Sequence, residues 1–216
     1  ELVRVYSFKQ DKLITLQSYL DDQAEKQESI YCLTADTLKQ AKSSPHLEGF
    51  KAKGLDVLLM TDPIDAFWIA QMGSFKDKPF VSISRDKYDL SELGADEVDG
   101  TEDDVESDGV VAIIKGCLGD IVEDVRASKN LVESPVRLVA GEGGLDFNLE
   151  RILKSQNPEF EGGKKVLEVN SNHDLVKKIP SLSEDVRASF CRVLFEPARI
   201  VDGEVPSDRQ QFSMDL

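Results

Sequence analysis

Short apolar runs alternate with amphipathic segments through the first part of the chain. Thr34 is placed to cap a helix, because its hydroxyl can accept the unpaired amide hydrogens of a first helical turn. Pro45 and Gly54 bracket the next helix, since proline suits the first helical position and glycine the residue after the last. The strand candidates are residues 29–33, 55–60 and 80–84, and the helix candidates are residues 35–43, 45–53 and 63–72. This order predicts a small, mainly parallel α/β layer.

A second series of elements starts at Val110. Apolar residues recur there at spacings of three and four up to Gly119, which predicts one apolar helix face. Asn172 is placed to cap a later short helix, and Ser183 or Pro180 to open the last one. The helix candidates are residues 110–118, 145–157, 172–179 and 183–201, and the strand candidates are residues 122–127, 136–140 and 166–169. We predict an α+β module.

An acidic segment separates the two series. Residues 96–108 hold eight acidic side chains and no Lys or Arg. The segment has few bulky side chains, so burying them cannot offset the entropy lost when such a charged segment is ordered. We therefore expect a first module over residues 1–94, a flexible linker over 95–109 and a second module over 110–216. The alternative is an exposed acidic loop within one domain.

The composition is that of a soluble globular protein. The 216 residues are 40% hydrophobic and 31% charged, and no run approaches the roughly 18 consecutive apolar residues that a membrane span needs. A formal charge of −15 repels nucleic acid and anionic lipid alike, so we expect neither as a partner. The chain begins at Glu1 without an initiator Met or a signal stretch, and we expect the natural protein to extend upstream.

Residue types that often carry chemistry are few and scattered. Cys32, Cys117 and Cys191 are odd in number and far apart, so we interpret them as buried free thiols in a reducing compartment. His46 and His173 have no His or Cys at ligand spacing, and each follows a predicted helix start. We expect neither a metal site nor a catalytic residue.

The helix predicted over 145–157 carries a pronounced apolar stripe. It follows a glycine-rich run at 141–144, which lacks the lysine and the spacing of a phosphate-binding loop. The stripe consists of Leu145, Leu149, Ile152 and Leu153, and the residues opposite it are Glu150, Arg151 and Lys154. Periodicity alone leaves two readings, ordinary core packing or a partly exposed binding surface. Phe67 and Trp68 pose the same question, because consecutive bulky residues cannot all face one side of a helix.

Several strings, in order along nearly the whole chain, resemble one family. Those of the first module are IYCLT at 30–34, SPHLE at 44–48, GLDVLL at 54–59, DPID at 62–65 and KPF at 78–80. Those of the second are LGD at 118–120, VRAS at 125–128, Leu131, SP at 134–135, LERILK at 149–154 and EVNSNH at 168–173. They resemble the end of the middle domain and the carboxy-terminal dimerisation domain of the ninety-kilodalton heat-shock chaperones, bacterial HtpG type.

The resemblance implies an ATP-driven clamp in the cytoplasm, whose nucleotide-binding domain, with its ATP and Mg, lies upstream of Glu1. No cofactor and no catalysis are then expected in this chain itself. The implied partners are a second copy of the chain, unfolded or partly folded client proteins, and other chaperones. The implied client-binding residues are Phe67, Trp68, Leu145, Leu149, Ile152 and Leu153.

The resemblance also implies homodimerisation through a four-helix bundle, with two helices from each chain. The implied contact residues are Phe190, Val193, Leu194, Ile200, Val201 and Phe212. Two departures weaken the expected dimer. Pro197 falls inside the bundle helix, at a cost of about 3 kcal/mol unless a kink relieves it. Arg199 stands where an apolar residue is expected.

Two functions from other classes compete with this one. The first is a stand-alone α/β enzyme, with a site above Met60 at the carboxyl edge of the first sheet and with His46 or Asp62 as the acting residue. The second is a pair of structural domains that serve only as a spacer.

Overall fold

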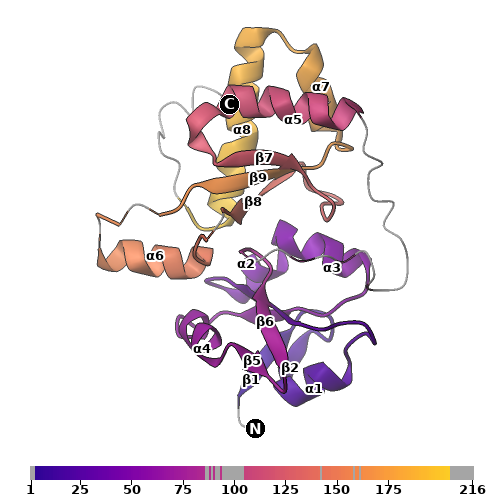
Figure 1. Cartoon of the computed structure of the whole chain (residues 1–216), viewed down its shortest axis with the longest axis vertical. Coiled ribbons are helices and arrows are strands. Elements are labelled where there is room, and N and C mark those ends of the chain that lie inside the picture. The colour runs from indigo at the N-terminus through magenta and orange to yellow at the C-terminus, as the bar shows by residue number, and fades with distance from the viewer. Residues whose placement is uncertain are drawn as a thin grey trace.

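Two sheets, one in each module, organise the fold (Figure 1). The structure is a computed structural model, and it describes residues 3–85, 88, 90, 93, 105–141, 143–157, 159–160 and 162–204. The first module is the indigo-to-magenta part of Figure 1, and the second is the pink-to-yellow part. The mixed α/β content confirms the predicted fold class.

The sheet of the first module has the strand order β2-β1-β4-β3-β6-β5. Its strands are β1 (Arg4–Ser7), β2 (Lys12–Thr15), β3 (Ile30–Thr34), β4 (Leu58–Met60), β5 (Ser74–Phe75) and β6 (Lys78–Ser82). The central strand β3 pairs in parallel with β4 and β6, whereas the outer pairings are antiparallel. The predicted parallel layer is therefore present at the centre, and the β1–β2 hairpin is an addition that the pattern did not predict.

Helices cover both faces of this sheet. They are α1 (Leu16–Asp21), α2 (Leu38–Lys42), the 3-10 turn η1 (Pro45–Leu47), α3 (Glu48–Ala52) and α4 (Asp65–Met72). Successive side chains of a strand point to opposite faces. Leu33 accordingly packs with Phe50 of α3 in one core, and Cys32 packs with Tyr19 of α1 in the other.

The second module has a small sheet of order β7-β9-β8, and its first and last helices pack on one face of that sheet. Its elements are α5 (Val105–Leu118), the 3-10 turn η2 (Gly119–Ile121), β7 (Asp124–Ala127), β8 (Val136–Ala140), α6 (Phe147–Gln156), β9 (Lys165–Val169), α7 (Asp174–Lys178), the 3-10 turn η3 (Ile179–Ser181) and α8 (Glu184–Val201). β9 pairs in parallel with β7 and antiparallel with β8. Val125, Leu138 and Leu167 form the core with α5 and α8.

Two predicted caps are wrong. α2 begins at Leu38, and Thr37 caps it by accepting a hydrogen bond from the amide of Gln40 at 3.2 Å. Thr34 is the last residue of β3 and directs its hydroxyl elsewhere. α7 is capped by His173, whose Nδ1 accepts from the amide of Leu175 at 3.2 Å, rather than by Asn172.

The predicted linker is too long at its carboxyl end. α5 begins at Val105, so residues 105–109 are helical. Ser107 is 8% exposed, and its hydroxyl hydrogen-bonds that of Ser171 at 2.8 Å. This contact stabilises the first turns of α5, and amino-acid composition alone could not predict it. Residues 94–104 lie outside the described residues, and the domain boundaries remain predictions. Cys32 and Cys191 are buried as predicted, whereas Cys117 is only half-buried, and none of the three forms a disulfide.

Candidate functional site

Helix α6 starts at a carboxylate that serves two modules. Asp146 caps the helix, accepting a hydrogen bond from the amide of Asn148 at 3.0 Å. The same carboxylate accepts hydrogen bonds from the hydroxyls of Thr34 at 2.6 Å, Ser82 at 2.8 Å and Ser84 at 3.2 Å. Thr34 and Ser82 are the last residues of two parallel strands of the first module, so both reach the same sheet edge. Asp146 is only 6% exposed.

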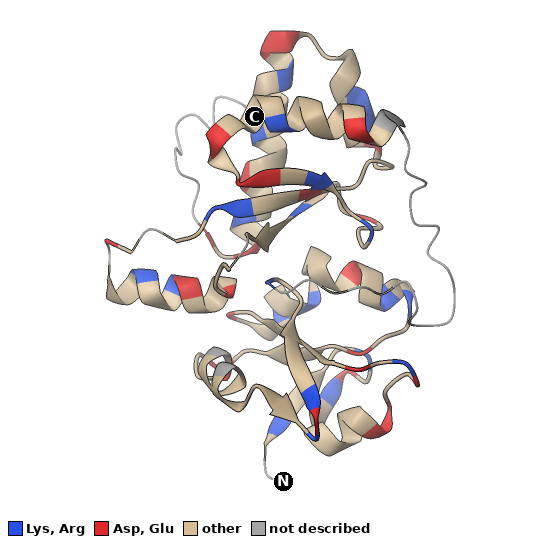
Figure 2. Cartoon of the chain, viewed as in Figure 1, with Lys and Arg blue, Asp and Glu red and all other residues tan. Residues whose placement is uncertain are grey.

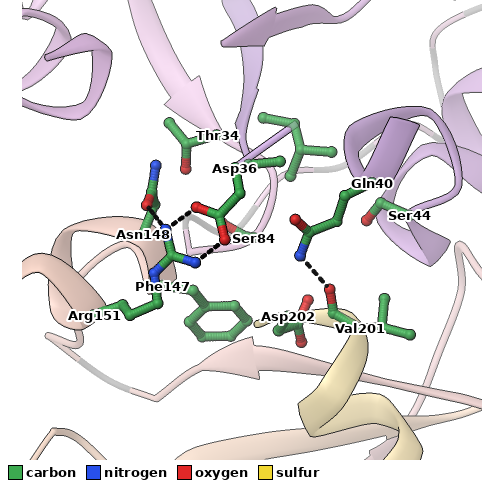
Figure 3. A pocket seen from close by; sticks show the side chains of 12 residues that line it. Thr34, Asp36, Gln40, Ser44, Ser84, Phe147, Asn148, Arg151, Val201 and Asp202 are labelled. Carbon is green, nitrogen blue, oxygen red and sulfur yellow. Dashed lines mark hydrogen bonds and ion pairs between the residues drawn. The ribbon is translucent and has the colours of Figure 1, made fainter. Parts of the chain in front are cut away.

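A second link joins α6 to the first module (Figure 3). The guanidinium of Arg151 forms a two-pronged ion pair with Asp36, and its Nη2 also donates to Asn148 at 2.8 Å. These side chains line a cavity of about 30 Å³, which has room for about one water molecule. The end of α8 closes the cavity, where Gln40 donates to the carbonyl of Val201 at 2.9 Å.

A buried ion pair ties α6 to its own module. Glu150 is 3% exposed and pairs with Lys165 of β9, and it also lies 3.2 Å from the ammonium of Lys154. The ammonium of Lys165 lies 4.5 Å from the centre of the Phe147 ring. Glu150 lies opposite the apolar stripe by helical periodicity, and its burial there is tolerable because β9 supplies a cation.

Another carboxylate of the first module is bound by a loop of the second. Glu48, the first residue of α3, accepts hydrogen bonds from the amides of Val132, Glu133 and Ser134 at 2.7, 2.8 and 3.1 Å. The Ser134 hydroxyl donates as well. Burial opposes ionisation, but these donors outweigh it and hold the pKa of Glu48 below its ordinary value. Gly49 allows the close approach, since a Cβ there would lie 3.1 Å from Asn130.

Charged residues alternate with core residues along the strands of the second module (Figure 2), so their side chains point to the sheet face away from the core. Glu168 of β9 binds Arg137 of β8 at 2.6 Å and Arg126 of β7 at 2.7 Å. Burial works against the ionised form, but the two guanidinium groups outweigh it and lower the pKa of Glu168. Tyr88, from the first core, meets the buried Arg137 on this face.

The end of α8 meets the first module at a buried pair. His46 is 1% exposed, and its Nε2 lies 3.5 Å from the carboxylate of Asp202. Burial raises the pKa of Asp202, an effect that His46 opposes. The ring of Phe147 lies edge-on to His46, with centroids 6.3 Å apart. The junction is thus built mostly from polar groups that sequence reasoning missed.

Comparison of the sequence with models of known protein families identifies the family of this chain. The family model described as Hsp90 protein matches residues 1–216. The chain belongs to the Hsp90 family.

Proteins with similar sequences support the assignment of this chain to the Hsp90 family. "Chaperone protein HtpG" from Nitrobacter winogradskyi is 42% identical over 211 residues, which cover 94% of the chain and 33% of the relative. The protein of the same name from Roseobacter denitrificans is 36% identical over 223 residues, covering 98% of the chain and 36% of the relative. That from Paramagnetospirillum magneticum is 38% identical over 226 residues, covering 99% and 36%. The chain therefore spans about a third of the length of these relatives.

The predicted client-binding residues of this Hsp90 chain lie on two helices in contact, α4 and α6. On α4, Phe67 is 46% exposed, while Trp68 is half-buried against Phe80 and donates to Asp65 at 2.8 Å. The stripe at and beside α6 is half-buried along its length; it comprises Leu145, Leu149, Ile152 and Leu153. Ile64, at 62% exposure, is an apolar neighbour that the prediction omitted. The client role of these residues remains a prediction.

The predicted dimer residues divide between two faces of α8. Leu194 is 8% exposed and lies in the chain's own core, so it has little surface for a partner. Ile200 and Val201 are 45% and 38% exposed, and Val186, which the prediction omitted, is 52% exposed. Phe190 and Val193 are half-buried, and Phe212 lies outside the described residues. Arg199, where an apolar residue was expected, pairs with Glu196 at 3.3 Å and Glu204 at 2.8 Å.

The enzyme alternative is not favoured. His46 is buried, whereas Asp62 is exposed and accepts a hydrogen bond from the amide of Ile64 at 3.1 Å. Neither lines the small cavity at the strand ends. Within the described ranges, no three His, Cys, Asp or Glu side chains gather as metal ligands. None of the helices described there has the length and apolar character to cross a bilayer.

Proposed function

We propose that this chain is the part of an HtpG-type chaperone that contacts unfolded client proteins and holds two protomers together. It corresponds to the end of the middle domain and the dimerisation domain. In the whole protein, which works in the cytoplasm, ATP and Mg act on a domain outside this chain, and other chaperones are candidate partners. The chain itself has no ATPase activity, and an assay of phosphate release from the purified 216-residue chain tests that claim.

The apolar surface across α4 and α6 carries the client proposal. Phe67 on α4 and Ile64 directly before it are exposed, and half-buried leucines lie on α6, which contacts α4. Each fully buried side chain of this size contributes roughly 1.5–3 kcal/mol, so a surface that leaves several incompletely buried favours transient apolar contacts with other chains.

Substitution within the stripe tests the client contact. Leu149→Asp with Leu153→Asp should abolish the chain's ability to slow aggregation of a chemically unfolded protein, followed by light scattering. Leu13→Asp with Leu175→Asp is the matched control, because these leucines are 57% and 39% exposed elsewhere. Equal suppression by both double variants would refute the assignment.

The second apolar face of α8 supports homodimerisation. Val186, Phe190, Val193 and Ile200 recur at spacings of four, three and seven, a heptad pattern on one side of the helix. The other side, with Cys191, Leu194, Phe195 and Ala198, packs into the core, and the half-buried Phe190 also contacts that core. A helix that carries a second apolar stripe needs a partner, and a second copy supplies the same stripe in a self-complementary interface.

Molecular mass in solution tests the dimer. The chain should be dimeric by light scattering at tens of micromolar, and Val186→Asp should make it monomeric. Val132→Asp is the control, since Val132 is similarly exposed at 47% outside α8. A monomeric parent chain, or a Val186→Asp variant that remains dimeric, would contradict the proposed interface.

A further inference from the structure

Both modules hold α6 through side chains at its start and in its first turns. The buried pair of Glu150 and Lys165 anchors the helix to the second module. Asp146 and Arg151 anchor it to the first, through hydroxyls and through Asp36. Because α4 of the first module also contacts α6, the first module both binds α6 through these side chains and covers part of its surface.

We propose that Asp146 is a positioning residue that couples the exposure of α6 to the closeness of the two modules. This inference rests on the proposed client role of α6 for its functional consequence, but the coupling itself is measurable without a client. When the first module is in place, its three hydroxyls hold the start of α6 against the ends of β3 and β6. When the modules separate, the apolar stripe becomes accessible.

The nature of the bonds explains why the coupling is sensitive. Within the described residues, the carboxylate of Asp146 is bound by three hydroxyls and one amide, all neutral donors. Hydrogen bonds lose strength steeply as they lengthen or bend. A buried carboxylate without its donors is costly, so a small displacement of the first module favours movement of Asp146 into water. α6 starts at that residue and moves with it.

The glycines before α6 allow such a movement. Gly143 has a φ of +70°, a conformation that glycine adopts without strain. Gly144 lies directly before Leu145 and Asp146 in the same short connection between β8 and α6. Gly143 therefore permits a backbone conformation close to the helix start that other residues resist, and the position of α6 depends on its side-chain contacts.

Removing the hydroxyls while keeping the carboxylate tests the coupling directly. The triple variant Thr34→Val, Ser82→Ala and Ser84→Ala leaves Asp146 free to cap α6. Hydrogen exchange of the 216-residue chain, followed by mass spectrometry, should show amides of α6 exchanging about ten-fold faster, with β8 and β9 unchanged. Ser43→Ala and Ser155→Ala are controls, because those hydroxyls bond only to nearby carbonyls in the hydrogen bonds described for them.

A second pair of variants separates the coupling from capping. Asp146→Asn keeps an oxygen that can cap the helix but replaces the charged oxygen that accepts from Ser82 and Ser84 by an amide nitrogen, whereas Asp146→Ala loses both oxygens. If Asp146 positions α6 through the first module, Asn should accelerate exchange nearly as much as Ala. If its role is capping alone, Asn should behave like the parent chain, and the coupling is then refuted. Unchanged exchange in the triple variant, or acceleration throughout both modules, also refutes it.

A client assay distinguishes this inference from the proposed function. The triple variant should suppress aggregation of a chemically unfolded protein at about three-fold lower concentration, because a larger fraction of molecules presents the stripe. Adding Leu149→Asp and Leu153→Asp should remove that gain. Faster exchange without any change in suppression supports the coupling and overturns the client role of α6. Unchanged exchange together with loss of suppression in the Leu→Asp variant overturns the coupling and supports the client role.

Discussion

The guanidinium of Arg137 on β8 donates a hydrogen bond to the hydroxyl of Tyr88 at 3.0 Å. The Tyr88 ring packs in the first module, with its centroid 5.1 Å from that of Phe50. One tyrosine therefore belongs to the core of one module and to the charged sheet face of the other.

The hydroxyl of Tyr88 should contribute measurably to stability. Tyr88→Phe keeps the ring but leaves the buried Arg137 without one acceptor, so the free energy of unfolding should fall by about 1–2 kcal/mol. Urea denaturation measures this. Tyr6→Phe is the control, since that hydroxyl lies in an exposed network with Asp11 and Lys42. An equal effect of the two substitutions would contradict the importance of the contact.

The stability contributed by Glu168 should depend on pH. Its folded pKa is lowered, so its charge stabilises the fold above the ordinary carboxyl pKa of 4.5, and the contribution is lost as pH falls through the folded pKa. Glu168→Gln should cost about 3 kcal/mol near neutral pH, and the difference from the parent chain should shrink below about pH 4.5. Urea denaturation at several pH values measures it, with Asp120→Asn as an exposed control. A difference that stays constant into acid would refute the prediction.

The hydrogen bonds of Glu48 should stabilise the contact between the two modules. Glu48→Ala leaves the amides of Val132, Glu133 and Ser134 without their acceptor, and should lower the free energy of unfolding by about 1–3 kcal/mol. Small-angle scattering should also show a larger radius of gyration. Glu133→Ala is a suitable control, because it removes a carboxylate from the same loop whose ion pair with Lys51 is exposed. If Glu133→Ala loosens the modules as much, the assignment to Glu48 fails.

Substitution by alanine should change the stability of the chain in opposite directions at two glycines. A Cβ on Gly162 would overlap Oε1 of Glu150, so Gly162→Ala should displace that carboxylate and destabilise the chain by about 1–3 kcal/mol. Gly116 lies within α5 and has nothing within 4 Å of an added Cβ. Gly116→Ala should stabilise by about 0.5–1 kcal/mol. Thermal unfolding compares the two, and a stabilising Gly162→Ala would show that Glu150 is not confined there.

Local pattern predicted most elements of the fold. The strand predicted at residues 136–140 has the bounds of β8, and the helix predicted at residues 145–157 contains α6. Both succeed because burial of one face imposes a period that is visible in the sequence. The free, mostly buried cysteines were predictable for a similar reason, since their neighbours are apolar.

The junction could not be predicted this way. Thr34 looks like a helix cap by local rules, but its hydroxyl bonds to Asp146, which lies 112 positions along the chain. Glu150 sits on the polar side of α6, but Lys165 of β9 gives it a buried partner. Glu48 is unremarkable in sequence, because its donors are backbone amides of another module. Pairings across such distances leave no periodic trace in one sequence.

The charged sheet face of the second module has a consequence for how the protein opens. Arg126, Arg137 and Glu168 remain compatible with water when the first module moves away, whereas an apolar face would attract other molecules. We therefore expect that, if the modules separate, this face does not promote self-association. Salt screens such pairs once water reaches them, so high ionic strength should weaken this ion-pair network within the second module when the face is exposed.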